Sequence, residues 1–507
     1  MPRTIPARHN LFMGFALAAL LGACAPAGPP PVSQQPGATA PQAGERIVLA
    51  RDPASQAKGD ELHPEVLKRF GGVYDNPRVS AHVEAIGRRL VAVTPQPAEK
   101  WTFTVLDTPD INAFALPGGY IYVTRGLVAL SEDEAALAGV VAHEIAHVTA
   151  RHSARREQRT QVAGAGLLLG SLGLAALGLE PPVVGSLLQT ALGGALASYS
   201  RDDEREADQV GIAYLAAAGY DPTAQADFLD VMARSARLDA QVAGRRYDPE
   251  ATGFFATHPA TAGRSREARA TAAATGVTDG ERGVAAHLAA IEGMAWGPSA
   301  AQGFVKDGAF VHPVLDFRFD VPEGWALANQ PDAVVLAARD GTRAIFDGDN
   351  ARGLSPEDYI SRIWGPAIKQ AVTAGDVSRL ERREIGGAPA ARALMPIRLG
   401  DTSYTGLLVA IARGNQVYRF IGLVPRGRRS ARTVAAMTDS FRRLTPAEKQ
   451  EARQRRIAVE AVRGGQDEAA FAARMNVEDA PLERFRVIND REPGDPLNAG
   501  ARVKLVR

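Results

Sequence analysis

The chain has 507 residues, of which 46% are hydrophobic, and its formal net charge at pH 7 is +1. A chain of this length and composition can bury several cores, so we expect two to four domains. The near-neutral charge, with basic residues scattered among acidic ones, argues against a nucleic-acid-binding protein. The single cysteine, Cys24, excludes an intramolecular disulfide and a cysteine-based metal site.

Residues 1–24 have the pattern of a secretory signal peptide. Arg3 and Arg8 precede an apolar run over residues 11–23, which ends in Leu21-Gly22-Ala23-Cys24. The segment resembles a bacterial lipoprotein signal, whose cleavage leaves Cys24 as a lipidated first residue. The next residue is alanine rather than aspartate, which by the usual sorting pattern implies the outer membrane, facing the periplasm. The alternative is an ordinary signal peptide in which Cys24 is incidental.

Residues 25–45 are rich in Pro, Gly, Ala and Gln and contain almost no large apolar side chains. Such a segment cannot bury enough surface to fold, so we interpret it as a disordered tether. The periodicity of apolar residues then predicts two helices and two strands, over residues 54–70, 77–93, 101–106 and 120–124, with the turn Pro117-Gly118-Gly119 before the last strand.

The central motif is His143-Glu144-Ile145-Ala146-His147, an H-E-x-x-H in a strongly helical apolar run. Residues four apart share one face of a helix, so the imidazoles of His143 and His147 can reach one metal ion. Glu144 can take a proton from a metal-bound water as that water attacks a carbonyl. Zinc suits this set because it accepts imidazole and carboxylate ligands and keeps an open position. Ser131-Glu132-Asp133-Glu134 is typical of a capping box that starts the helix, and we expect His152 to point away from the pair.

A catalytic zinc normally needs a third protein ligand, and residues 200–211 offer one. Glu204 and Asp208 lie four apart on one helical face, so one carboxylate can bind the metal while the other orients a ligand histidine. Glu206 points elsewhere. Alone, this stretch would be a solvated acidic helix start, but its pairing with the H-E-x-x-H motif favours a metal site.

The two motifs, His143-Glu144-x-x-His147 and Ser200-Arg201-x-x-Glu204-x-x-x-Asp208, resemble the zinc peptidase family that includes the CAAX prenyl endopeptidase, HtpX and the periplasmic proteases BepA and LoiP. The resemblance covers residues 46–275 and implies a mainly helical zincin domain of the gluzincin type with a small sheet. It implies one Zn²⁺ per chain, held by His143, His147 and Glu204. Glu144 and Asp208 would be the catalytic residues, with Asp208 orienting a ligand histidine.

Two further stretches agree with this resemblance. Residues 112–123 look like the family's strand beside the cleft, and they contain the implied substrate-binding residues Asn112, Ala113, Phe114, Ala115, Gly118 and Gly119. An extended peptide can pair with such a strand; the alternative is an ordinary sheet strand. Thr257-His258-Pro259 with Arg264 looks like a later element of the family, in which His258 would be a regulatory fourth ligand or a transition-state contact. As a fourth ligand, His258 would keep the enzyme latent until substrate displaces it.

Residues 162–179 are apolar and nearly long enough to cross a bilayer. Their many glycines and alanines, the break at Pro181-Pro182 and the second apolar run over residues 183–196 favour a helical hairpin packed over the active site. A membrane-dipping or substrate-gating role is the alternative. Further on, Asp221-Pro222 predicts a helix start, and this helix should run to about Ala240.

Residues 276–303 form a predicted helical connector. Over residues 304–445 the pattern changes to alternation, which predicts an α+β domain without a catalytic constellation. The expected strands are 317–322, 333–337, 344–346, 405–412 and 416–423, the last two joined as a hairpin by Arg413-Gly414-Asn415, and the expected helices are 356–374 and 431–444. The stretch from Phe319 to Trp325 weakly resembles the PsbP-like fold of photosystem II.

Residues 446–507 have the order strand, helix, helix, strand, with Phe471 and Phe485 as apolar positions of the two helices. This layout resembles a LysM peptidoglycan-binding module of the βααβ type. Gly465-Gln466-Asp467 stands where such modules have Gly-Asp-Thr, which leaves glycan binding open.

The sequence therefore predicts a multidomain α+β protein that acts as a zinc metalloendopeptidase of the bacterial envelope. Its expected substrates are misfolded or stalled periplasmic and outer-membrane proteins, and its lipid anchor would place it on the outer membrane. Peptidoglycan and the outer-membrane assembly machinery are further candidate partners. The alternative is a periplasmic assembly factor or chaperone-like binding protein with a latent or structural zinc site, although such a site needs no base like Glu144. An integral-membrane prenyl-protein protease is disfavoured, because several long transmembrane spans are lacking.

Overall fold

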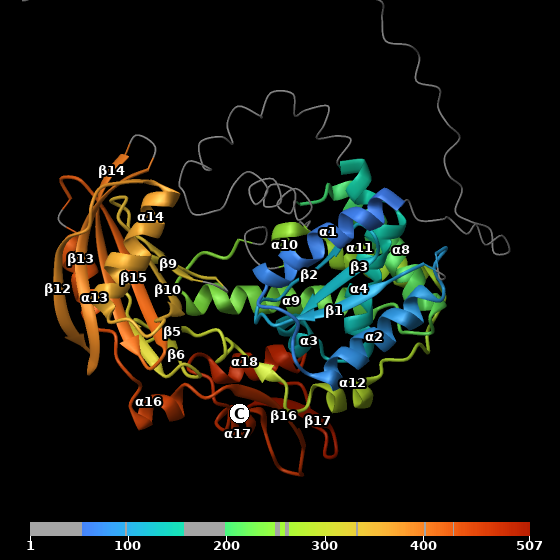
Figure 1. Cartoon of the computed structure of the whole chain (residues 1–507). Helices are drawn as coiled ribbons and strands as arrows, with labels where there is room; N and C mark the ends of the chain where they lie inside the picture. The colour runs from blue at the N-terminus through green and yellow to red at the C-terminus, as the bar shows by residue number, and fades with distance from the viewer. Residues whose placement is uncertain are drawn as a thin grey trace, which may run out of the picture. The chain divides into compact units, whose positions relative to one another are not determined.

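The computed structural model describes residues 53–96, 99–156, 198–248, 254–258, 263–330, 333–399, 402–428 and 430–507. The predicted signal peptide with Cys24, the tether, and the apolar runs 162–179 and 183–196 lie outside these residues. The described chain mixes helices and sheets (Figure 1), in agreement with the predicted mixed α and β composition. None of the helices in these ranges combines the length and apolar character needed to cross a membrane.

Helices surround a small sheet in the first part of the chain. The helices are α1 (Pro53–Arg69), α2 (Pro77–Val91), α3 (Arg125–Leu130), α4 (Glu134–Thr149), α8 (Arg201–Ala217), α9 (Ala224–Val242), α10 (Phe254–Thr257), α11 (Arg264–Ala274) and α12 (Val284–Ile291). The strands are β1 (Thr102–Leu106), β2 (Ala113–Leu116) and β3 (Tyr120–Thr124), in the order β1-β3-β2. β1 runs parallel to β3 and β2 antiparallel to it, so β2 is an edge strand of this sheet. The helices and strands predicted between residues 54 and 124 are confirmed to within two residues.

Helix α4 is buried along almost its whole length, because it packs against α2, α8, α9 and β2. The predicted capping box at its start is wrong. Asp133 is the N-cap, and its Oδ1 accepts the backbone N–H of Ala136 at 2.8 Å. Ser131 instead ends α3, where its hydroxyl donates to the carbonyl of Leu127 at 3.0 Å. The two helices follow each other so closely that Ser131 serves the first and not the second.

The predicted start of α9 at Asp221-Pro222 is also wrong. The carboxylate of Asp221 accepts hydrogen bonds from the backbone N–H and the hydroxyl of Thr223, which closes a turn ahead of the helix. The helix therefore begins at Ala224 and runs to Val242. Side-chain bonding to the local backbone commonly delays a helix in this way.

The second part of the chain contains an eight-stranded sheet in the order β11-β13-β14-β15-β10-β9-β8, with β12 paired to β13. Its strands are β8 (Ala326–Asn329), β9 (Val334–Ala337), β10 (Arg343–Asn350), β11 (Thr373–Ala374), β12 (Ser378–Ile385), β13 (Ala388–Leu399), β14 (Thr402–Arg413) and β15 (Gln416–Pro425). A separate sheet contains β5 (Phe304–Lys306), β6 (Ala309–His312) and β7 (Phe317–Asp320). The hairpin joining β14 and β15 is confirmed.

The helices of this part are α13 (Pro356–Tyr359), the π-helix η2 (Ile360–Trp364), α14 (Gly365–Ala371) and α15 (Ala431–Asp439). The prediction of one helix over residues 356–374 is therefore right only to residue 371, after which the chain enters β11. The helix predicted over residues 431–444 ends five residues early, because the chain after it pairs with β7 through Arg442 and Arg318.

The C-terminal part has α16 (Pro446–Glu451), β16 (Arg455–Ala461), α17 (Glu468–Ala472), α18 (Pro481–Ile488) and β17 (Arg502–Val506). The predicted order of strand, helix, helix and strand is present. β16 pairs antiparallel with β17 and also with β4 (Ala295–Trp296), so the connector supplies a third strand to this sheet.

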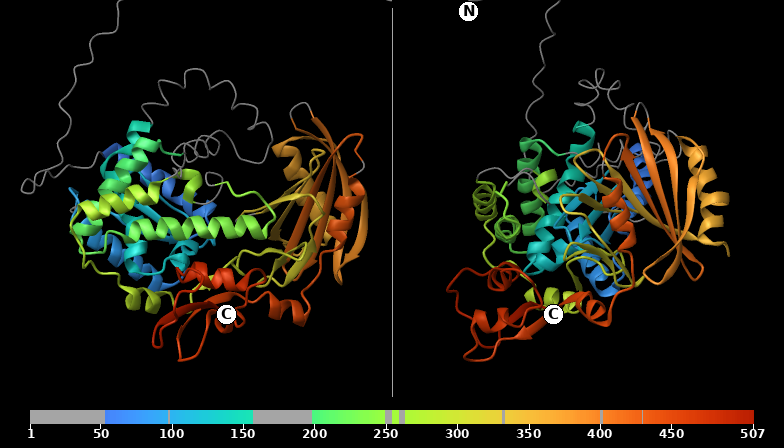
Figure 2. Two further views of the ribbon diagram at one scale, coloured as in Figure 1. Left: turned by 180° about the vertical axis from the view of Figure 1, so that it is seen from behind. Right: turned by 90° about the vertical axis from the view of Figure 1, so that its left-hand side faces the viewer.

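The C-terminal part packs directly on the helices around α4, with α18 beside α3 and α9 (Figure 1, Figure 2). Lys504 of β17 is 1% exposed, and its ammonium donates to the carbonyls of Ala129, Leu130 and Ser131 at 3.2, 3.0 and 2.6 Å. A cation at the C-terminal end of a helix satisfies carbonyls that have no partner within the helix. Lys504 thus fixes the C-terminal part to the end of α3, just before α4.

Candidate metal centre

Four buried side chains from three segments converge on one point. His143 and His147 belong to α4, Glu204 to the first turn of α8, and His258 follows α10; one ligand atom from each lies within 4.8 Å of the others. The Nε2 atoms of His143 and His147 are 3.0 Å apart, and Nε2 of His147 lies 3.4 Å from Oε1 of Glu204. Two imidazoles and a carboxylate are the ligand set that zinc accepts, so this group could bind a metal ion.

Asp208 lies behind His143, on the side away from this group. Its Oδ1 is 2.9 Å from Nδ1 of His143, which leaves Nε2 of that ring facing the other ligand atoms. Arg264 binds the same carboxylate twice, from Nε to Oδ2 at 2.7 Å and from Nη2 to Oδ1 at 2.9 Å, and Gln225 donates to Oδ1 at 2.8 Å. Arg264 also pairs with Oε2 of Glu204 at 2.9 Å. One guanidinium therefore links two of the buried carboxylates.

His152 lies behind His147, and the prediction that it points away from the pair is wrong. Its Nδ1 is 2.7 Å from Nδ1 of His147, and its Nε2 is 3.3 Å from Oε2 of Glu206. Glu206 in turn accepts a hydrogen bond from Arg155 at 2.7 Å. A continuous helix would have turned His152 away, but α4 ends and Arg151 adopts a left-handed φ of 57°. Because the chain changes direction at Arg151, the side chain of His152 points towards His147.

Glu144 is completely buried, and neither of its carboxylate oxygens accepts a hydrogen bond from a described residue. Nε2 of His258 lies 3.3 Å from Oε1 of Glu144. Burial raises the pKa of Glu144 above its ordinary value, against the opposing effect of His258 and His143. A buried carboxylate without a donor is unusual, and this one is poised to accept a proton at the metal-binding group.

The site gathers more carboxylates than arginines among the described residues. Among the described residues at this site, the carboxylates Glu144, Glu204 and Asp208 face one arginine, Arg264. Burial alone would lower the pKa of His143, yet hydrogen bonds to Asp208 and Glu204 raise it to about 9. The carboxylates therefore favour a positively charged group beside them. With all three carboxylates ionised and the histidines neutral, the negative charges exceed Arg264 by two, which a divalent cation would neutralise, so the residues present fit zinc.

Close packing of α8 on α4 sets the distances between the histidines of α4 and the carboxylates of α8. Glu204, Asp208 and Gly211 share one face of α8, and the helix starts at Ser200, whose hydroxyl accepts the backbone N–H of Asp203 at 3.2 Å. A Cβ on Gly211 would lie 3.0 Å from the backbone nitrogen of His143 and 3.2 Å from its Cα. These contacts would be tighter than most that a real Cβ makes, so glycine favours the close approach of the two helix backbones.

A cleft of about 720 Å³ lies beside β2 and α10. Of the predicted substrate-binding residues, Asn112 and Phe114 line this cleft, while Ala113 and Ala115 are buried. Gly118 and Gly119, both with positive φ, form the turn into β3 and are not among the lining residues.

Across the same cleft, α10 contributes Phe254, Phe255 and Thr257 to the wall. The backbone N–H of Phe254 donates to the carbonyl of Ile111 at 2.9 Å, and its ring stacks on His258 at 4.3 Å. The cleft and the metal-binding group therefore share α10 as a common wall.

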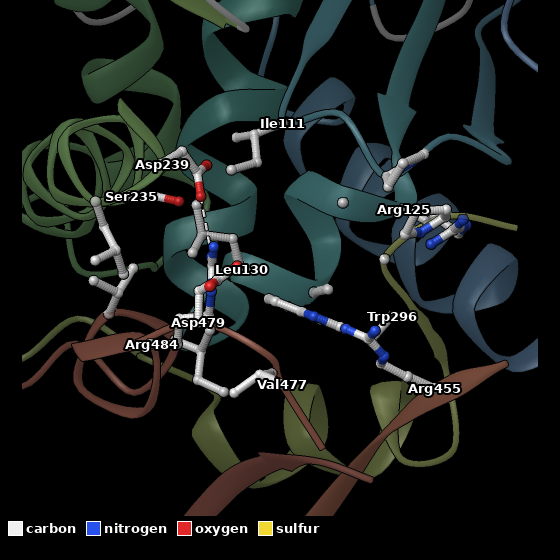
Figure 3. A pocket seen from close by; sticks show the side chains of 18 of the residues that line it. Ile111, Arg125, Leu130, Ser235, Asp239, Trp296, Arg455, Val477, Asp479 and Arg484 are labelled. Carbon is white, nitrogen blue, oxygen red and sulfur yellow. Dashed lines mark hydrogen bonds and ion pairs between the residues drawn. The ribbon is translucent and has the colours of Figure 1, made fainter. Parts of the chain in front are cut away.

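A smaller cavity of about 260 Å³ lies between α3, α9 and the C-terminal part (Figure 3). Four of its charged residues form two pairs, Arg484 with Asp239 at 3.0 Å and Arg455 with Glu478 at 2.6 Å. It contains none of the residues of the metal-binding group. We interpret it as part of the junction between the C-terminal part and the helices.

Comparison with known proteins agrees with this geometry. Residues 77–272 match Peptidase family M48, a range that runs from α2 into α11 and includes all four members of the buried group. The chain therefore contains a region that matches the metallopeptidases of family M48, which confirms the resemblance seen in the sequence.

The chain is similar to the "Putative beta-barrel assembly-enhancing protease" of Vibrio cholerae, with 33% identity over 214 residues that cover 41% of this chain and 42% of that protein. The "Beta-barrel assembly-enhancing protease" of Escherichia coli is 32% identical over 210 residues, covering 40% and 41%. The "Mitochondrial metalloendopeptidase OMA1" of Schizosaccharomyces pombe is 32% identical over 212 residues, covering 41% and 58%. The chain thus spans less than half the length of the first two relatives.

Among solved structures, cyanobacterial PsbP from Synechocystis matches with 14% identity and a TM-score of 0.23, covering 29% of this chain and 98% of that one. A score this low does not establish a common fold, so the PsbP-like resemblance of the α+β part stays a prediction.

Proposed function

We propose that the protein is a zinc metalloendopeptidase in which His143, His147 and Glu204 hold one zinc ion. The observation that carries this proposal is the convergence of three ligand side chains beside Glu144, a buried carboxylate with no hydrogen-bond donor of its own among the described residues. A purely structural site has no use for such a group, because its burial costs free energy without a compensating bond.

Zinc bound there would polarise the scissile carbonyl and lower the pKa of a water molecule towards 7. Glu144 would take a proton from the water that attacks the scissile carbonyl, hold it on one carboxylate oxygen, and give it to the amide nitrogen as the C–N bond breaks. Asp208 keeps Nε2 of His143 directed at the metal-binding group through its contact with Nδ1. Arg264 fixes the positions of Asp208 and Glu204 through its ion pairs with both carboxylates.

The cleft beside β2 is the proposed substrate site. An extended peptide would pair with this edge strand through main-chain hydrogen bonds, which select for unfolded chain rather than for a particular sequence. We propose misfolded or stalled envelope proteins as substrates. The names of the bacterial relatives, which describe proteases that enhance β-barrel assembly, support this choice. The pattern ending at Cys24 supports an outer-membrane lipoprotein that faces the periplasm.

His258 is proposed to keep the enzyme latent. Its Nδ1 lies 3.0 Å from Oε1 of Glu204 and its Nε2 3.3 Å from Glu144, so it stands between the third ligand and the base. In this position His258 blocks access to the base. Displacement of the segment after α10 by a substrate would release Glu144.

We propose that the chain is organised as a signal peptide, a tether, the peptidase domain, a connector, an α+β domain and a LysM-like module, over residues 1–24, 25–45, 46–275, 276–303, 304–445 and 446–507. A groove of about 390 Å³ in the last module is lined by Gln466, Asp467, Leu482, Arg486 and Asp495, and its polar lining supports peptidoglycan as a candidate ligand. The long part of the chain after residue 275, in which the sequence shows no catalytic constellation, supports a second candidate function, an assembly factor whose zinc site is latent.

The test of the peptidase proposal is hydrolysis of unfolded casein by the zinc-loaded protein and by Glu144→Gln. We expect the wild type to cleave casein and Glu144→Gln to bind zinc without cleaving, since the amide cannot accept the proton. His312→Asn, a change at a buried histidine of the α+β part, is the control and should cleave like the wild type. Cleavage by Glu144→Gln at the wild-type rate would contradict the proposal.

A further inference from the structure

We propose that His152 is a positioning residue for the zinc ligand His147, and that Glu206 and Arg155 hold His152 in place. The inference rests on the proposed function, because it assumes that His147 binds the metal through Nε2. The observation behind it is the 2.7 Å contact between Nδ1 of His147 and Nδ1 of His152.

Proton placement along this contact follows from the geometry. Nε2 of His147 faces the other ligand atoms, so a metal-binding His147 must carry its proton on Nδ1. That N–H donates to Nδ1 of His152, which must then be the unprotonated nitrogen of its ring. The proton of His152 lies on Nε2 and is donated to Oε2 of Glu206 at 3.3 Å. The chain of contacts therefore selects one tautomer for each histidine.

Burial makes this acceptor necessary. His147 is 1% exposed and His152 is fully buried, so water cannot replace the bond. The ring of Tyr199 stacks on His147 with centroids 3.9 Å apart and planes 18° apart, which closes one face of the imidazole. Without His152, the Nδ1–H of His147 would be a buried donor without a partner. The ring would then turn or change tautomer, and either change removes Nε2 from the metal.

The two ligand histidines are supported in different ways. His143 is held by the carboxylate of Asp208, whereas His147 is held by a neutral imidazole. Glu206 lies two residues after the ligand Glu204 on α8. One turn of that helix therefore supplies both a metal ligand and the carboxylate that accepts the proton of His152. Arg155, which lies in the segment after α4, pairs through Nη2 with Oε2 of Glu206 at 2.7 Å. The contacts among His147, His152, Glu206 and Arg155 thus connect α8 to the C-terminal end of α4, the helix that carries both ligand histidines.

The experiment compares His152→Asn with His152→Leu. The two side chains have nearly the same shape, but Asn offers an oxygen close to the position of Nδ1 and Leu offers no acceptor. Zinc dissociation constants are measured on the full protein by competition with a chromogenic chelator, so the readout is independent of hydrolysis. We expect His152→Leu to weaken zinc binding by about 10- to 100-fold, the usual cost of removing a partner behind a metal ligand. His152→Asn should restore most of that loss.

Matched controls separate positioning from folding. Thermal unfolding of the metal-free Asn and Leu variants should give similar midpoints, and His312→Leu should bind zinc like the wild type. If His152→Leu does not fold, Glu206→Leu and Glu206→Gln replace it; Glu206 is 45% exposed, and its leucine variant should weaken zinc binding more than its glutamine variant.

The outcomes distinguish this inference from the proposed function. Equal zinc affinity in the wild type, Asn and Leu proteins would overturn the role of His152 and leave the peptidase assignment intact. An equal loss in both variants would assign His152 to packing and would also overturn it. A wild type that binds no zinc would overturn both.

Discussion

Arg264 offers the sharpest test of how the site is held together. It is 5% exposed and touches Asp208 twice, Glu204 once and the carbonyl of His258 at 3.2 Å. Arg264→Met keeps the length of the side chain but removes the only arginine that faces these carboxylates among the described residues. Breaking a buried ion pair by removing one partner costs about 3–5 kcal/mol, because the other charge is left uncompensated. We expect a loss of this size in the metal-free protein.

The magnitude should depend on zinc. Bound metal neutralises part of the charge of Glu204, so Arg264→Met should lose less stability with zinc than without it, and zinc should stabilise the variant more than the wild type. Urea unfolding with a chelator or with excess zinc, followed by tryptophan fluorescence, measures both quantities. Amide hydrogen exchange in α8 shows whether the loss of stability in Arg264→Met is concentrated in that helix. Arg264→Lys should be intermediate, since lysine keeps the charge but not the two parallel bonds. A metal-free Arg264→Met protein within about 0.5 kcal/mol of the wild type would refute this reasoning.

Three further variants test other parts of the account. His258→Ala should retain zinc and raise basal casein hydrolysis several-fold, because the base is no longer blocked; a fall in hydrolysis would assign His258 to the transition state. Lys504→Met should lower the free energy of unfolding by about 1–3 kcal/mol, measured by urea, because three buried carbonyls lose their donor; no change would show that the contact is dispensable. Gly211→Val should cost about 1–3 kcal/mol and weaken zinc binding, since its Cβ would lie only 3.0 Å from the backbone nitrogen of His143 and its two methyl groups would push α8 away from α4. The exposed control Ala213→Gly should cost about 1 kcal/mol without changing the zinc dissociation constant, and an equal effect on zinc binding would contradict the packing argument.

The metal-binding residues could be predicted because their placement depends on local periodicity. His143 and His147 share a face of one continuous helix, and so do Glu204 and Asp208, whatever the tertiary structure. The partners behind them could not all be predicted in the same way. His152 reaches His147 only because Arg151 adopts positive φ, and no glycine or asparagine at that position signals the reversal. Gln225 lies on a different helix, α9, so its contact with Asp208 depends on tertiary packing.

The sheet of the α+β part shows the same limit. Strand β12 is nearly all exposed and rich in arginine and glutamate, while β13 contains several alanines and two prolines, Pro389 and Pro396. Neither composition indicates a strand. The two strands exist because β13 pairs with β14 along its length and β12 pairs with β13. The turn Gly386-Gly387 between them was the available signal, since both residues have positive φ as a tight hairpin requires.

The most direct test of the central claim is the zinc content of the purified protein, measured by elemental analysis together with casein hydrolysis. The account predicts one zinc per chain in the wild type and in Glu144→Gln, with hydrolysis lost only in the latter, and loss of zinc from Glu204→Ala. Full zinc content in Glu204→Ala would move the third ligand elsewhere, with Glu206 as the first residue to test. A wild-type protein that contains no zinc, or that cleaves casein equally well with Gln at position 144, would contradict the account.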